Sequence, residues 1–102
     1  MTIEIKYEND TAHITVTGNI DTYGGVELSE KFIEITDNPK IKNAKLDLKG
    51  VKQINSAGIG KILKFYKHFE NKKGSFEIIH VSDKVLELFQ EINLHKIITI
   101  SK

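Results

Sequence analysis

The chain opens with two short segments in which apolar and polar residues alternate, over residues 2–7 and 12–17. Alternation with a period of two places the apolar side chains on one face of a β-strand. The polar residues 8–10 between the two segments are typical of a turn. We therefore predict an antiparallel hairpin whose second strand ends at Gly18.

The pattern then changes to the spacing of a helix. Three apolar residues recur at intervals of four and three positions: Leu28, Phe32 and Ile35. Either Asp21 or Thr22 can cap the start of this helix, and the Asp-Asn-Pro sequence at 37–39 ends it. We predict a helix that runs to about Thr36.

A third alternating segment, over residues 44–49, predicts another strand, and Val51 and Ile54 are expected to anchor the loop that follows. An apolar stripe at helical spacing comes next, and we expect it to face the core: Ile59, Ile62, Leu63, Tyr66 and Phe69. Cationic residues surround the stripe: Lys61, Lys64, Lys67 and His68. Such a face is usually solvated, and docking of a partner is the less common alternative. Residues 71–74 end this helix with lysines and a glycine.

The remaining pattern predicts a strand over 76–81, a helix capped by Ser82, a left-handed stop at Asn93 and a last strand over 97–100. After the opening hairpin, strands and helices alternate, which indicates an α/β fold. We predict a single domain over residues 1–102. Its mixed, mostly parallel sheet of about five strands packs against three to four helices.

Composition narrows the possible functions. The 15 basic residues are all lysine and nearly balance 14 acidic residues. Without arginine the chain lacks the bidentate donors that read guanine or grip phosphates, so we expect no nucleic-acid binding. The absence of cysteine excludes disulfides, thiolate metal sites and thiol redox chemistry. We expect no signal peptide, no membrane insertion and a cytoplasmic location, because no apolar run approaches about 18 residues.

The segment from Ile54 to Gly60 follows a predicted strand and begins the second predicted helix. Backbone N–H groups in the first turn of a helix have no partner and carry a partial positive charge. The hydroxyl of Ser56 is therefore either a helix cap or part of an anion site. Small residues follow Ser56 and do not screen it.

The sequence contains no clear motif of a catalytic or metal-binding site. The four histidines have no metal-ligand spacing: His13, His68, His80 and His95. Asp47 has no sequence-adjacent carboxylate and is interpreted as a solvated strand residue. Ser56 has no G-x-S-x-G context and there is no P-loop motif, although sequence order leaves a Ser–His–Asp triad open. We expect no enzyme activity, no metal and no cofactor.

Four motifs in order make the chain resemble the STAS domain family, specifically the stand-alone bacterial anti-sigma factor antagonists. Residues 16–21 (VTGNID) resemble the family's G-x-[LI]-D turn, and residues 46–48 (LDL) its central strand. Residues 55–60 (NSAGIG) resemble its D-S-x-G-[LI]-G loop, and residues 92–94 (INL) its x-G-L before the last strand. The resemblance covers essentially the whole chain.

The resemblance implies a switch. In these antagonists the serine of the D-S-x-G loop is phosphorylated by an anti-sigma factor that is also a serine kinase, with a histidine-kinase-like ATPase fold. The unphosphorylated antagonist captures this kinase and frees a sigma factor, and a metal-dependent serine phosphatase restores it. Ser56 matches the phosphorylated position. The partner surface that the resemblance implies comprises Asn19, Asp21, Thr22, Asn55, Ser56, Ala57, Gly58 and Gly60.

A phosphoryl group adds nearly two negative charges. The helix N-terminus favours this charge in the free protein, whereas an interface disfavours it, through desolvation and through Asp21 if the family geometry holds. We expect Gly58 and Gly60 to leave room for the partner.

The chain departs from the family at Asn55, where Asp is usual. Asn55 supplies no charge beside Ser56, although its side-chain oxygen can cap the helix. A STAS subunit that is never phosphorylated, and that binds constitutively to a partner such as a transporter, is therefore an alternative. A receiver-type or small hydrolytic enzyme is less favoured, because a receiver needs clustered carboxylates at strand ends to hold magnesium.

Overall fold

The computed structural model describes all residues from Met1 to Lys102. Strands β1 (Thr2–Glu8) and β2 (Thr11–Thr17) form the predicted antiparallel hairpin. Asn9 takes the left-handed conformation, with φ of 57°, in the turn between them. The hairpin prediction is confirmed.

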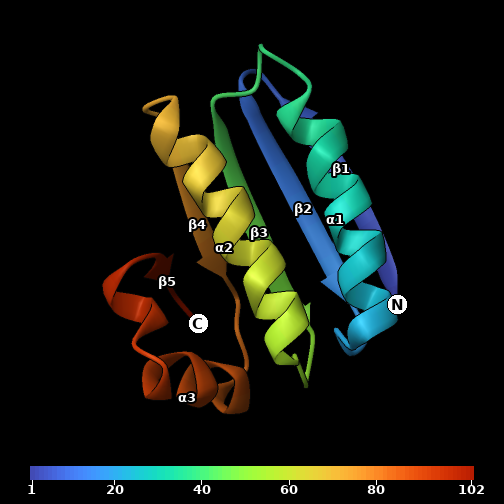
Figure 1. The fold of residues 1–102 in the computed structure, drawn as a ribbon, viewed down its shortest axis with the longest axis vertical. Coiled ribbons are helices and arrows are strands. Elements are labelled where there is room, and N and C mark those ends of the chain that lie inside the picture. The colour runs from blue at the N-terminus through green and yellow to red at the C-terminus, as the bar shows by residue number, and fades with distance from the viewer.

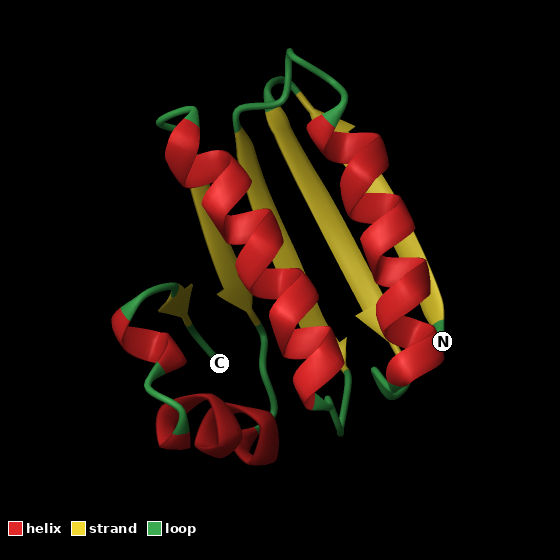
Figure 2. Ribbon diagram, in the orientation of Figure 1, coloured by secondary structure: helices red, strands yellow, loops and turns green.

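The sheet has five strands in the order β1-β2-β3-β4-β5, with β3 over Asn43–Gly50, β4 over Ser75–Ile79 and β5 over Thr99–Ile100. Strands β2 to β5 are parallel neighbours. Helices α1 (Thr22–Thr36) and α2 (Ser56–Asn71) run side by side across one face of the sheet (Figures 1 and 2). Helix α3 (Asp83–Glu91) and a 3₁₀ turn (Leu94–Lys96) lie at one end, before β5. The predicted α/β class and mixed sheet are confirmed.

The core consists of 23 buried hydrophobic residues and contains no buried polar residue. At its centre Phe32 of α1 stacks on Phe65 of α2, with ring centroids 3.9 Å apart. The predicted stripe on α2 omits Phe65, which is 2 % exposed and fully in the core. The flanking stripe residues Ile59, Leu63 and Tyr66 are half-buried and pack against that core. The buried face of α2 is therefore rotated from the predicted one.

The C-terminal part differs in detail from the prediction. Strand β4 ends at Ile79, two residues early, because His80 adopts a left-handed backbone with φ of 57°. Asn93 has φ of 60°, which confirms the predicted left-handed stop. The predicted last strand over 97–100 is too long: the N–H groups of Ile97 and Ile98 donate to Leu94 O in the 3₁₀ turn, so only Thr99 and Ile100 pair as β5.

The sheet face away from α1 and α2 is largely polar. Asp47 lies on it, half-buried, and its Oδ2 is 2.9 Å from Nδ1 of His80. Its other oxygen, Oδ1, accepts a hydrogen bond from the backbone N–H of Lys49. Asp47 thus lies on the solvent-facing side of the sheet, as expected, and it also pairs with His80, which directly follows β4. None of the helices is both long enough and apolar enough to cross a membrane.

Candidate functional site

Two loops meet where the parallel strands β2 and β3 end. Gly18, with φ of 104°, starts the first loop, and its N–H donates to the carbonyl of Gly50 at 2.9 Å. Ile20 and Ile54 then form an isolated parallel bridge, with Ile20 N–H donating to Gln53 O and Asn55 N–H donating to Ile20 O. The carboxyl ends of parallel strands are where α/β folds place their functional loops. Sequence positions 18–21 and 51–55 thus form one surface.

Each loop ends in a side chain that caps a helix. Asp21 Oδ1 accepts a hydrogen bond from Gly24 N–H at 2.8 Å and caps α1. Asn55 Oδ1 accepts from Gly58 N–H at 2.9 Å and caps α2. The cap predictions for Asp21 and Asn55 are confirmed. The interpretation of Ser56 as a cap is wrong, since Asn55 holds that position and Ser56 is the first helical residue.

Ser56 is exposed, and its hydroxyl makes no hydrogen bond within the chain. It stands at the start of a 16-residue helix whose first-turn N–H groups have no intrahelical partner. Asn55 caps the N–H of Gly58 only. The hydroxyl is therefore free for chemistry in a partly positive field.

The two glycines of this segment have different surroundings. A Cβ on Gly58 would lie 2.5 Å from Cγ2 of Ile20 and 3.1 Å from Cγ1 of Ile54, so Gly58 is buried where α2 meets the loops. The expectation that Gly58 leaves room for a partner is wrong, because this space holds core side chains. A Cβ on Gly60 would meet nothing within 4 Å, as expected for an accessible residue.

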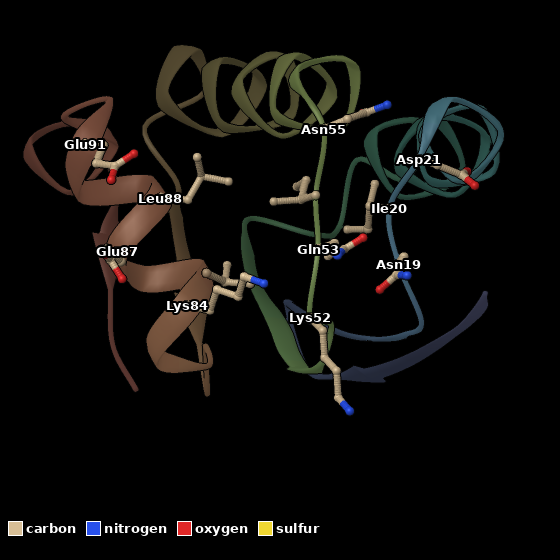
Figure 3. Close-up of a pocket in the computed structure, with 12 residues that line it drawn as sticks. Asn19, Ile20, Asp21, Lys52, Gln53, Asn55, Lys84, Glu87, Leu88 and Glu91 are labelled. Atoms are coloured by element: carbon tan, nitrogen blue, oxygen red, sulfur yellow. The ribbon is translucent and has the colours of Figure 1, made fainter.

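A groove of about 530 Å³ runs between these loops and α3 (Figure 3). Its apolar side chains come from both walls: Ile20, Ile54, Val85 and Leu88. In Figure 3, Leu88 faces the space toward Ile20. The polar lining also comes from both walls: Asn19, Asp21, Lys52, Gln53, Asn55, Lys84, Glu87 and Glu91. The site is thus an apolar cleft with charges of both signs at its margins.

The predicted partner surface divides into three parts. Asn19, Asp21 and Asn55 line the groove. Four further residues are exposed near the starts of α1 and α2: Thr22, Ser56, Ala57 and Gly60. Gly58 is buried between them and the core. The sequence reasoning missed the wall from α3, because no local motif in residues 83–91 signals that this helix faces the two loops.

The surroundings of the site give little support to catalysis. No group of three or more histidine, aspartate or glutamate side chains is arranged to hold a metal ion. Asp47 and His80 do form a carboxylate–imidazole pair, yet no serine or threonine hydroxyl bonds to His80. Ser56 is not hydrogen-bonded to any histidine. Asp47, His80 and Ser56 therefore do not form the hydrogen-bonded chain of a Ser–His–Asp triad.

Comparison with known proteins identifies the family to which this fold belongs. The STAS domain family matches residues 2–102. The chain is 30% identical over 102 residues to the anti-sigma-B factor antagonist of Listeria monocytogenes, covering 98% of this chain and 88% of the relative. It is 25% identical over 99 residues to the anti-sigma-B factor antagonist of Bacillus subtilis, which covers 97% of this chain and 89% of the relative. The phosphorylated form of the Bacillus cell fate determinant SpoIIAA has the same fold, with a TM-score of 0.78 and 15% identity over 99% of this chain and 92% of that one. The chain belongs to the STAS domain family.

Proposed function

We propose that this protein is an anti-sigma factor antagonist that is switched by phosphorylation of Ser56. In its unphosphorylated state it captures an anti-sigma factor that is also a serine kinase, and thereby frees a sigma factor. The observation that carries the proposal is the exposed, unbonded hydroxyl of Ser56 beside a groove formed by α3 and two loops. Two relatives that match nearly the whole chain are named anti-sigma-B factor antagonists, which supports the same role.

The free protein tolerates the modification. A phosphoryl group on the first residue of α2 lies at the positive end of the helix, where such a charge is favoured by up to about 2 kcal/mol. The backbone N–H groups of Ser56 and Ala57 are available as donors to its oxygens, because those of Gly58 and Ile59 already donate to Asn55. Phosphorylated protein should therefore keep its fold.

The complex with the anti-sigma kinase does not tolerate phosphorylation of Ser56. Once the partner covers Ser56, the phosphoryl group loses water, and the neighbouring loop, which is hydrogen-bonded to the Ser56 loop, adds the negative charge of Asp21 to the same surface. An unpaired ion buried in an interface costs several kcal/mol, and about 4 kcal/mol is a thousandfold change in affinity. Phosphorylation thus dissociates the partner without unfolding the antagonist, and a metal-dependent serine phosphatase resets the cycle in the cytoplasm.

The catalytic step belongs to the kinase. Asn55 gives no carboxylate beside Ser56, and its side chain is already used in capping α2 and in bonding to Thr22. The base and the metal-bound nucleotide are therefore supplied by the partner. This chain contributes the acceptor hydroxyl and the docking surface, with no cofactor of its own.

The test is to incubate the protein with ATP and an anti-sigma factor kinase that it captures, and to measure its intact mass. A gain of about 80 Da is expected, from one phosphoryl group. The Ser56→Ala variant, whose fold loses no hydrogen bond, should show no gain. Unchanged mass of the wild-type protein in a stable complex would instead favour a constitutive STAS subunit. The feature that favours this second candidate function is Asn55, which stands where the family usually has an acidic residue.

A further inference from the structure

A second groove, of about 340 Å³, lies on the outer side of α1 and α2, away from the loops. Its floor includes Phe32 and Phe65, the stacked pair that closes the core between the two helices. Ile33 also lines it, and this side chain is 54 % exposed. The groove begins beyond the first turn of α2 and contains neither Ser56 nor any residue of the two loops.

The charge of this groove is one-sided. Lys61, Lys64 and Lys67 line it, and no aspartate or glutamate does. None of the three lysines takes part in an ion pair within the chain. The three carboxylates of α1 all lie outside the lining, and that of Glu34 is paired with Lys31: Glu27, Glu30 and Glu34. Three free cations around an apolar floor contrast with a whole chain whose formal net charge is +1.

The wall beside these lysines carries groups that can hydrogen-bond: Ser29, Thr36, His68 and Asn71. Of these, the Nε2 atom of His68 is buried and has no hydrogen-bond partner. This nitrogen is closed off from solvent, so it is not a contact point for a ligand that lies in the groove. Asp37 and Lys72 are the charged groups that act on this ring, and neither lines the groove.

We propose that the groove between α1 and α2 binds a short acidic segment of another protein, with its carboxylates on the three lysines and an apolar side chain against Ile33 and the phenyl floor. The lysines recur every third residue, so the row from Lys61 to Lys67 extends along α2 for about 9 Å. That length suits several carboxylates along a peptide rather than one phosphate. The middle of a helix also offers no free N–H groups to cradle a phosphate. The proposal is independent of the proposed function, because it uses none of the same residues.

The test is an NMR titration of the ¹⁵N-labelled protein with a 12-residue peptide of alternating glutamate and leucine. Such a peptide spans about 40 Å when extended, which exceeds the length of about 24 Å of the 16-residue α2. A peptide with glutamine in place of glutamate and inorganic phosphate serve as the comparison probes. The groove variant carries Lys61→Gln, Lys64→Gln and Lys67→Gln together. The matched control carries Lys6→Gln, Lys49→Gln and Lys96→Gln, which remove the same charge from exposed lysines elsewhere that form no ion pair.

The acidic peptide should shift the resonances of residues in the groove, and its affinity should fall roughly tenfold in the groove variant and less than about twofold in the control. The glutamine peptide and phosphate should leave these resonances unmoved. An equal loss in both variants would overturn the proposal, because it would show general attraction to lysine. Phosphate reproducing the shifts would identify a simple anion site, and absent groove shifts would show no site at all; each result would also overturn it. Phosphorylation of Ser56 is measured separately and decides the proposed function whatever the titration gives.

Discussion

The side-chain amide of Asn55 donates a hydrogen bond to the hydroxyl of Thr22 across 3.3 Å, although 33 positions separate the two residues. Asn55 Oδ1 at the same time accepts from the N–H of Gly58. One side chain therefore holds together the starts of α1 and α2, the two helices that begin at the proposed docking surface. An aspartate could fill the cap but could not donate to Thr22.

Replacing Asn55 separates these two roles. Asn55→Ala should lower the free energy of unfolding by about 1 kcal/mol, the usual cost of losing a cap. Asn55→Asp should change it by less than about 0.5 kcal/mol, because the carboxylate still caps the helix, is favoured by its dipole, and can accept from the Thr22 hydroxyl. Chemical denaturation of the three proteins measures this. Equal losses in the two variants would show that capping by residue 55 contributes nothing.

The two glycines of the Ser56 helix provide a matched pair. Gly58→Ala places a Cβ 2.5 Å from Ile20 and should destabilise the protein by about 1–3 kcal/mol through overpacking. Gly60→Ala meets open space and should stabilise it by up to about 1 kcal/mol, because alanine favours the helix. Thermal denaturation distinguishes them. A stabilised Gly58→Ala variant would contradict the close packing of α2 on the loop.

A structural feature could be predicted from the sequence where residues close together in the chain determine it. The hairpin, the three helix starts and the stop at Asn93 follow from alternation, capping residues and a left-handed turn, all within a few residues of sequence. Asp21, Asn55 and Ser82 accordingly cap the helices.

Features set by contacts between distant segments were missed. Phe65 is buried because Phe32 stacks on it from α1, and periodicity within α2 does not contain that contact. Gly58 is enclosed by Ile20 from another loop. The wall that α3 adds to the groove, and the pairing of His80 with Asp47, likewise depend on how strands β3 and β4 and their connections are placed.

Stability should depend on pH through His68. Burial lowers the pKa of this imidazole below its ordinary value of 6.5, and Lys72 lowers it further, whereas Asp37 acts in the opposite direction. The folded state therefore prefers the neutral ring. The stabilisation is fully present above the unfolded pKa of 6.5 and is lost as the pH falls below it toward the lower folded value.

The free energy of unfolding should accordingly fall between pH 7.5 and pH 5 (about one unit above and somewhat below the ordinary histidine value). His68→Gln, which cannot be protonated, should flatten that slope, and His95→Gln serves as a control at an exposed histidine. Denaturant titrations across the pH range measure it. An unchanged slope in His68→Gln, or an equal change in the control, would contradict the role of His68.

The groove beside Ser56 should contribute to capture of the partner. Leu88 lines it from α3, whereas Ile92 lies just beyond the helix, 46 % exposed and outside the lining. Leu88→Ala should weaken binding of the anti-sigma kinase by about 1–3 kcal/mol, roughly 5- to 150-fold. Ile92→Ala should have little effect. Surface plasmon resonance gives both values, and equal affinities in Leu88→Ala and wild type would remove α3 from the docking surface.

The most direct measurement is the affinity of the kinase for the unphosphorylated protein, for the protein phosphorylated at Ser56, and for the variants Ser56→Ala and Ser56→Asp. The dissociation constant should rise by roughly a hundredfold or more on phosphorylation, as expected for a charge buried without a partner. Ser56→Ala should bind like the unphosphorylated protein and resist release by ATP, and Ser56→Asp should bind more weakly. Equal affinity of the phosphorylated and unphosphorylated proteins would contradict the switch.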